Sequence, residues 1–118
     1  NLSARDDIYF LPEQGNIAQR EVVKLFSKAH SEIKIAIYSF TNKAFLKALK
    51  QAARRGVKIK IVADYDSNKN QRYHSIVPQL RKLRNIEVHL LKGAGKGRYK
   101  GIMHIKLFII DNRVVSFG

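Results

Sequence analysis

Segments typical of β-strands alternate with segments typical of α-helices along the chain, and this alternation constrains the fold more than any other feature. Residues 32–40 and 57–64 show the two-residue period of strands. Residues 17–29 and 43–55 carry their apolar side chains at the three- and four-residue spacing of one helix face. Strand–helix repeats of this length favour a mostly parallel sheet joined by right-handed crossovers.

Shorter elements complete the pattern. They are expected at the following positions: strands at residues 8–12 and 86–91, a helix at 75–83, a surface loop at 65–71, and a hairpin of strands 103–110 and 114–117 with its turn at 111–113. Pro78 weakens the expected helix, because proline donates no backbone hydrogen bond. We therefore predict an α/β fold with a mixed, mostly parallel central sheet flanked by helices on both faces, in one domain over residues 1–118.

The chain is strongly basic. It has 23 Lys and Arg residues against nine Asp and Glu residues, which gives a formal net charge of +14. A field of this sign attracts polyanions and speeds their encounter with the protein. The charge favours nucleic acid over an anionic membrane surface as the partner, although membrane association stays open. Charge alone does not decide whether the polymer is only bound or also cut.

His104 and Lys106 are the residues best suited to chemistry. They are two positions apart at the start of an apolar strand, so their side chains are expected to share one face of the sheet. An imidazole serves as a nucleophile or proton carrier near neutral pH, and an ammonium group stabilises charge on phosphate oxygens. A histidine and a lysine at the start of a strand are also commonplace in a basic protein. From the residues alone, catalysis and a plain surface role remain alternatives.

The pattern His104-x-Lys106-x-x-x-x-Asp111 resembles the H-x-K-x-x-x-x-D motif of the phospholipase D superfamily, which also lies on an apolar strand. Gly118 follows Asp111 at the distance of the glycine that continues the family motif. The serine and asparagine that come next in the family would lie beyond Gly118. The chain is therefore expected to be a C-terminally incomplete piece of a longer protein.

The similarity extends upstream of the motif. Residues 35–41, the helix after them and residues 55–64 look like the first half of the compact, single-motif members of this superfamily, the Nuc-type bacterial endonucleases. The resemblance covers essentially the whole chain, from about Ile8 to Gly118. It implies export to the bacterial periplasm or cell envelope, although residues 1–7 lack the apolar core of a signal peptide.

The resemblance also implies a role for each motif residue. In this family one motif histidine attacks phosphorus to give a phosphohistidine, and a second one protonates the leaving oxygen; His104 corresponds to this histidine. Lys106 corresponds to the phosphate-binding lysine, and Asp111 to the third motif residue, which serves orientation and local structure more than proton transfer. Because one chain supplies one motif, a homodimer is implied. Two histidines and two lysines would act without a metal ion or other cofactor.

Further candidates surround the motif. Residues 92–101 form a basic, glycine-rich segment that leads into the motif strand and is suited to holding phosphates and stacking on a base. The residues expected to contact substrate are Lys92, Lys96, Arg98, Tyr99, Lys100 and Ser39. The alternative is a solvated linker. Thr41 and Asp64 also end strands, but a helix cap and a turn residue explain them equally well.

The sequence predicts no metal site. Cysteine is absent, which excludes thiolate chemistry, disulfides and cysteine-based zinc sites. His30, His74 and His89 show no metal-ligand spacing and are expected to be structural or surface residues.

The predicted function is a metal-independent, largely non-specific endonuclease that acts on DNA, single-stranded DNA included, or RNA. A phospholipase D-type lipid phosphodiesterase at an anionic membrane is one alternative. It would need an exposed apolar segment near the site, and residues 92–101 carry almost no apolar side chains. A non-catalytic, basic nucleic-acid-binding domain is the other.

Overall fold

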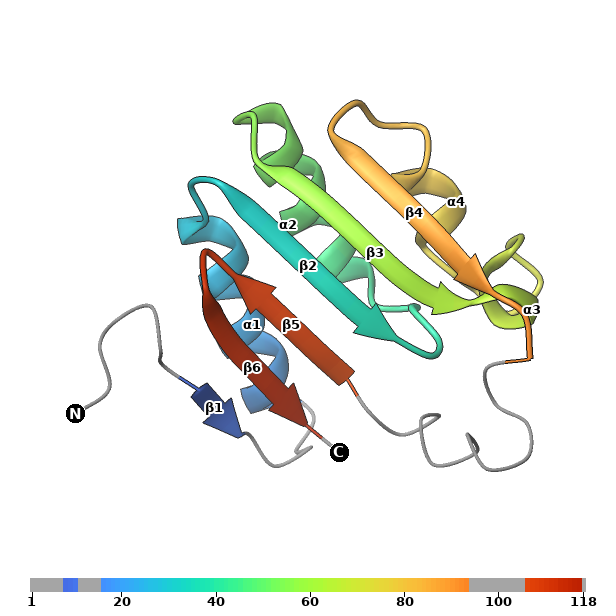
Figure 1. Ribbon diagram of the computed structural model, residues 1–118, viewed down its shortest axis with the longest axis horizontal. Helices are drawn as coiled ribbons and strands as arrows, with labels where there is room; N and C mark the ends of the chain where they lie inside the picture. Colours follow the sequence, from blue (N-terminus) through green and yellow to red (C-terminus); the bar gives the residue numbers. More distant parts are fainter. Residues whose placement is uncertain (1–7, 11–15, 94–105, 118) are drawn as a thin grey trace.

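The computed structural model describes residues 8–10, 16–93 and 106–117, and the centre of this part is a six-stranded sheet (Figure 1). Its strands are β1 (Ile8–Phe10), β2 (Glu32–Ile37), β3 (Lys58–Asp64), β4 (Ile86–Leu91), β5 (Lys106–Ile110) and β6 (Arg113–Phe117). The strands lie side by side in the order β1-β6-β5-β2-β3-β4. β5 is antiparallel to both of its neighbours, and the other described pairs are parallel. The predicted mixed, mostly parallel sheet is confirmed.

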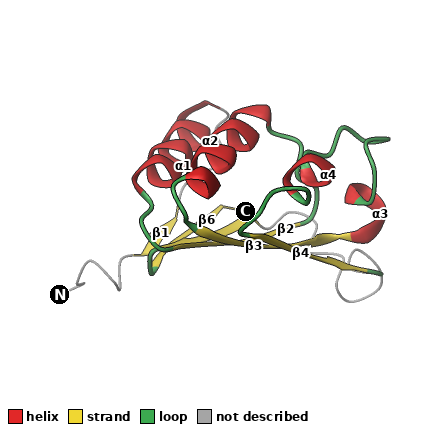
Figure 2. Cartoon of the chain, turned by 90° about the horizontal axis from the view of Figure 1, so that it is seen from above, coloured by secondary structure: helices red, strands yellow, loops and turns green. Residues whose placement is uncertain are grey.

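The described helices all lie on one face of this sheet (Figure 2). They are α1 (Asn16–Lys28), α2 (Lys43–Arg54), α3 (Tyr65–Asn68) and α4 (Val77–Leu80). For the described part of the chain, the prediction of helices on both faces is therefore wrong. The connections β1 to β2, β2 to β3 and β3 to β4 all advance across the sheet in the same direction. Right-handed crossovers that advance in one direction place every helix on the same side.

The core lies between the helices and the sheet. Alternate residues of β2 and β3 point into it, including the fully buried Ile33 and Ile61. Phe26 of α1, Phe45 of α2 and Phe108 of β5 meet in pairs, with ring centroids 5.6, 5.7 and 5.8 Å apart in edge-to-face geometry. This cluster fixes both long helices over the reversed strand β5.

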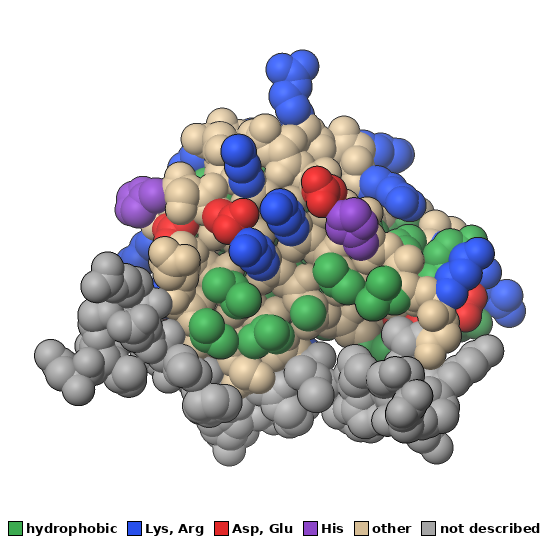
Figure 3. Space-filling view, viewed as in Figure 1, with side chains coloured by type: hydrophobic (Ala, Val, Ile, Leu, Met, Phe, Trp, Pro, Cys, Tyr) green, Lys and Arg blue, Asp and Glu red, His purple; other side chains and the backbone are tan. Residues whose placement is uncertain are grey.

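The opposite face of the sheet carries no helix from the described residues, and its side chains divide into two groups (Figure 3). Charged side chains lie toward the start of β2 and β3, where Lys34 and Lys60 are exposed. Half-buried apolar side chains lie beside them: Ala36, Val62, Leu107, Ile109 and Val114. No helix in the described part of the chain is both long enough and apolar enough to cross a membrane.

Two local predictions need correction between β3 and β4. The expected surface loop contains the single-turn helix α3, which Asp64 caps by accepting a 2.9 Å hydrogen bond from the backbone N–H of Ser67. The expected helix at residues 75–83 is reduced to the four residues of α4. Pro78 lies in its first turn and prevents an earlier start, and Asn85, at a φ of 71°, turns the chain into β4.

Candidate active site

The register of the sheet fixes the position of Lys106. This residue begins β5 and pairs with Ile37 and Phe117, the last residues of β2 and β6. Because β5 runs the opposite way, its first residue meets the ends of its neighbours. We call this end of the sheet, where β2, β3, β4 and β6 finish and β5 begins, the carboxyl edge. Open α/β sheets usually bind their ligands at such an edge.

Lys106 faces the helices. It is half-buried and lies on the same side of β5 as the buried Phe108 and Ile110, since residues two apart share a face. Its ammonium group therefore belongs to the side of the sheet where the loop from β2 to α2 passes. The partner residue His104 lies outside the described residues, and so do Lys96, Arg98, Tyr99 and Lys100.

The loop from β2 to α2 borders Lys106. Ser39 is exposed in this loop, which puts one of the predicted substrate contacts at the carboxyl edge. Thr41 is not the cap of α2. Asn42 holds that position, because its side-chain oxygen accepts hydrogen bonds of 2.8 and 3.2 Å from the N–H groups of Ala44 and Phe45.

Asn68 was missed at the level of sequence, yet it joins the ends of β2 and β3. The residue is 1% exposed. Its side-chain nitrogen donates to the carbonyl oxygens of Tyr38 (2.7 Å) and Asp64 (2.8 Å), and its side-chain oxygen accepts from the Phe40 N–H (3.1 Å) and the Ser75 hydroxyl (2.7 Å). The polar stretch around Asn68 predicts only a surface loop. Asn68 is buried because the ends of β2 and β3 lie side by side in the folded chain, which the local sequence does not show.

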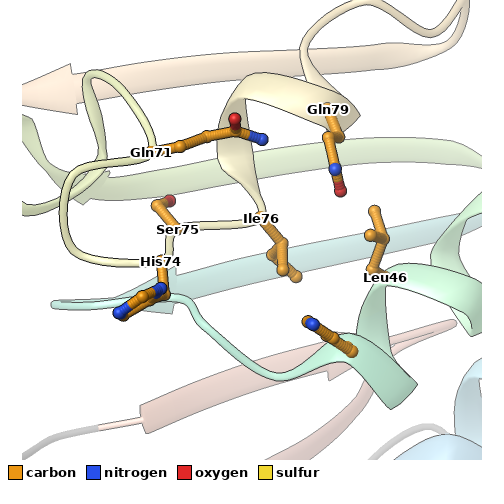
Figure 4. A pocket seen from close by; sticks show the side chains of 7 residues that line it. Leu46, Gln71, His74, Ser75, Ile76 and Gln79 are labelled. Carbon is orange, nitrogen blue, oxygen red and sulfur yellow. The ribbon is translucent and has the colours of Figure 1, made fainter.

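A pocket of about 540 Å³ opens beside this network (Figure 4). It lies between the start of α2 and the segment from Gln71 to Gln79, which a hydrogen bond from the Ile76 N–H to the Phe40 carbonyl ties to the β2–α2 loop. Its lining residues are Lys43, Leu46, Gln71, His74, Ser75, Ile76 and Gln79. The pocket has the size of a small-molecule site and offers two basic side chains next to the carboxyl edge.

Lys92 directly follows β4, so the end of this strand also brings a basic side chain to the carboxyl edge. Its ammonium group lies 4.9 Å from the ring centroid of Tyr65. Among the described residues, no three His, Cys, Asp or Glu side chains gather into a group that could hold a metal ion.

Asp111 lies at the other end of β5. It is five positions from Lys106 in sequence, or about 16 Å along an extended strand. Its carboxylate accepts hydrogen bonds from the N–H groups of His30 (2.7 Å), Ser31 (2.9 Å) and Glu32 (3.0 Å) and from the Ser31 hydroxyl (2.8 Å). The structure thus separates Asp111 from Lys106. Its contacts serve local structure, which is the role expected of the third motif residue.

The hairpin turn explains why the carboxylate reaches these donors. Asp111 and Asn112 have φ values of 47° and 73°, so they form a two-residue turn rather than the expected three-residue one. Partial burial alone would raise the pKa of Asp111. The hydrogen bonds from Glu32, His30 and Ser31 outweigh burial and lower the pKa from 3.8 to about 2.

This lowered pKa predicts a loss of stability in acid. The unfolded chain binds the proton at a higher pH than the folded one, so the contribution of Asp111 is complete above about pH 5 and disappears as the pH falls toward 2. Asp111→Asn should flatten the pH dependence of the free energy of unfolding by about 1–2 kcal/mol over this range, allowing for solvent screening. Urea unfolding at several pH values measures it. Asp66→Asn, at an exposed carboxylate, is the control; equal slopes for both variants would contradict the prediction.

Residues 22–118 match a protein-family model described as the PLD-like domain of cardiolipin synthase. This match covers the carboxyl edge and the whole motif. The chain belongs to this PLD-like family, in the phospholipase D superfamily. No curated protein matches the chain significantly.

Solved structures agree with the family. NucT from Helicobacter pylori is 42% identical with a TM-score of 0.69, and the match covers 80% of this chain and 60% of NucT. Nuc from Salmonella typhimurium, described as a phospholipase D family member, is 29% identical with a TM-score of 0.61, over 80% of this chain and 57% of Nuc. The PLD-like chain thus spans about three-fifths of each relative.

TrmBL2, an archaeal chromatin protein described with a novel mode of DNA binding, shares the fold alone. It is 20% identical with a TM-score of 0.57, and the match covers 82% of this chain and 34% of that protein.

Proposed function

We propose that this PLD-like chain is a metal-independent, largely non-specific endonuclease that hydrolyses phosphodiester bonds of DNA or RNA. The observation that carries the proposal is the place of Lys106: the motif lysine lies at the carboxyl edge, half-buried and on the helix-covered side, next to the ends of β2 and β6. An ammonium group held at such a site stabilises the charge that develops on a phosphate during displacement.

In the proposed reaction His104 attacks phosphorus, and the bond between phosphorus and the leaving oxygen breaks. A protonated His104 from a second copy of the chain donates its proton to that oxygen. Water then attacks the phosphohistidine and gives its proton to the second histidine, which releases a terminal phosphate and restores both groups. The reaction therefore requires a homodimer with the two carboxyl edges facing each other across the axis.

Nucleic acid is favoured as the substrate by the distribution of charge. The net charge is +14, and Lys43, Lys69 and Lys92 all follow strands that end at the carboxyl edge. A long polyanion gains affinity from many such cations through counterion release, whereas a single lipid headgroup contacts only a few. The lipid phosphodiesterase stays as the second candidate, because the family model is described by a lipid enzyme.

Cleavage in excess EDTA tests the proposed function. The full-length protein is expected to cut single- or double-stranded DNA or RNA under these conditions and to leave vesicles of an anionic phospholipid intact. Labelled substrates of all five kinds, at matched phosphate concentration, separate the candidates in one experiment. Lipid hydrolysis without nucleic-acid cleavage would favour the lipid enzyme, and binding without any cleavage would favour a non-catalytic domain.

A further inference from the structure

Tyr65 carries two ammonium groups over its ring. The Nζ atom of Lys92 lies 4.9 Å from the ring centroid, and that of Lys69 lies 5.2 Å from it. Both distances are within the range of cation–π contacts. Lys69 also forms an exposed ion pair of 3.6 Å with Asp66. The ring of the half-buried Tyr65 is therefore in contact with two exposed cations.

These three residues come together because two strands end side by side. Tyr65 begins α3 immediately after β3, Lys69 follows α3, and Lys92 follows β4. β3 and β4 are parallel neighbours, with Asp64 opposite Leu91, and α3 lies beside the end of β4 (Figure 1). The cluster thus belongs to the same carboxyl edge as Lys106, two to three strands away, or about 10–15 Å.

We propose that Tyr65, Lys69 and Lys92 form a stacking platform for an unpaired base of the strand that is cut at His104 and Lys106. An aromatic ring binds a base by stacking whatever its sequence, and lysines beside the ring hold the flanking phosphates. The base takes the place of one ammonium group on the ring, and that ammonium group then meets a phosphate. The proposal rests on the proposed nuclease function and adds where the strand lies and which form of it binds.

The form of the substrate follows from the stacking. A base within a duplex already stacks on its neighbours and offers no free face to a side chain, whereas a single strand offers one at every nucleotide. The platform therefore favours single-stranded substrates of any sequence. Its distance from Lys106 also requires the strand to extend over more than one nucleotide from the scissile phosphate.

A scan of abasic positions tests this proposal. Single-stranded DNA oligonucleotides with one cleavable phosphodiester and a single abasic site at successive positions are cut by the full-length protein. One position, away from the scissile phosphate, is expected to raise KM roughly 10-fold while kcat stays within about twofold. Tyr65→Ala should raise KM for the intact oligonucleotide by a similar factor and abolish the position effect. Tyr65→Phe should retain both.

Tyr73→Ala is the matched control, since Tyr73 is 53% exposed and lies beside a cation, Arg72, at 5.5 Å. It should leave the position effect intact. If the protein cleaves in EDTA but KM does not depend on the position of the abasic site, the stacking platform is contradicted and the nuclease function is not. Equal effects of Tyr65→Ala and Tyr73→Ala on KM would contradict the platform in the same way. Absence of all binding and cleavage would instead overturn the proposed nuclease. The scan on the wild-type protein keeps the test valid if Tyr65→Ala folds poorly.

Discussion

Replacing His104 with alanine is expected to lower the rate of nucleic-acid cleavage at least about 10³-fold, because both the nucleophile and the proton donor of the proposed dimer are lost together. Lys106→Ala should lower kcat by about 10²- to 10³-fold, since it removes charge stabilisation but leaves the histidine. Single-turnover cleavage of an end-labelled oligonucleotide in EDTA measures both changes. The free energy of unfolding should stay nearly constant for Lys106→Ala, because the lysine is only half-buried.

The chain offers matched controls for both positions. His89 is an exposed histidine on β4 whose Nε2 atom lies 2.6 Å from the Oε2 atom of Glu87, at hydrogen-bond distance. Lys34 is an exposed lysine near the start of β2. His89→Ala and Lys34→Ala should change kcat by less than about threefold. A His104→Ala protein that still cleaves at the wild-type rate would remove the phosphohistidine mechanism. Mixed dimers of wild-type and His104→Ala chains should also be nearly inactive, since each reaction uses two copies of the histidine.

Replacing Asn68 with leucine is expected to lower the free energy of unfolding by roughly 3–5 kcal/mol. Leucine has a similar volume but forms no hydrogen bond with the four polar groups that Asn68 satisfies, and it leaves no room for a water molecule to bond them instead. The affected groups hold together the ends of β2 and β3, so the carboxyl edge should loosen first. Chemical unfolding measures the loss of stability, and amide hydrogen exchange of residues 38–40 and 75–77 locates it.

Asn70→Leu provides the comparison for this effect. Asn70 lies two residues further along, is exposed, and accepts only a local hydrogen bond of 3.0 Å from the Arg72 N–H. Its replacement should cost less than about 1 kcal/mol. A similar loss for the two variants would mean that the buried hydrogen bonds of Asn68 contribute little to stability.

The elements of this fold were predictable where local pattern decides them. The two-residue period of β2 and β3 and the helical period of α1 and α2 each reflect one buried face. This pattern arises whichever element packs against that face. The side of the sheet that the helices occupy was not predictable, because it depends on the order of the strands. Asn68 was missed for a related reason: two of its four partners, Phe40 and Tyr38, lie 28 and 30 residues away in sequence. The backbone partners of Asp111 lie 79 to 81 residues away.

The site was predictable only in part. The spacing of His104 and Lys106 indicated a shared face, and the reversed direction of β5 then put Lys106 beside the ends of β2 and β6. Nothing in the sequence around Tyr65 indicates that Lys92 reaches its ring, because the contact depends on two strands ending side by side.

The four residues between Lys106 and Asp111, the spacer of the motif, set the distance between these two side chains and the face of the sheet on which Lys106 lies. Asp111 anchors one end of β5 to the amides that precede β2, and Lys106 lies at the other end, with four residues between them. Side chains alternate between the faces of a strand, so removing one of the four would turn Lys106 away from the helices, to the opposite side of the sheet. The length of the spacer must therefore stay fixed.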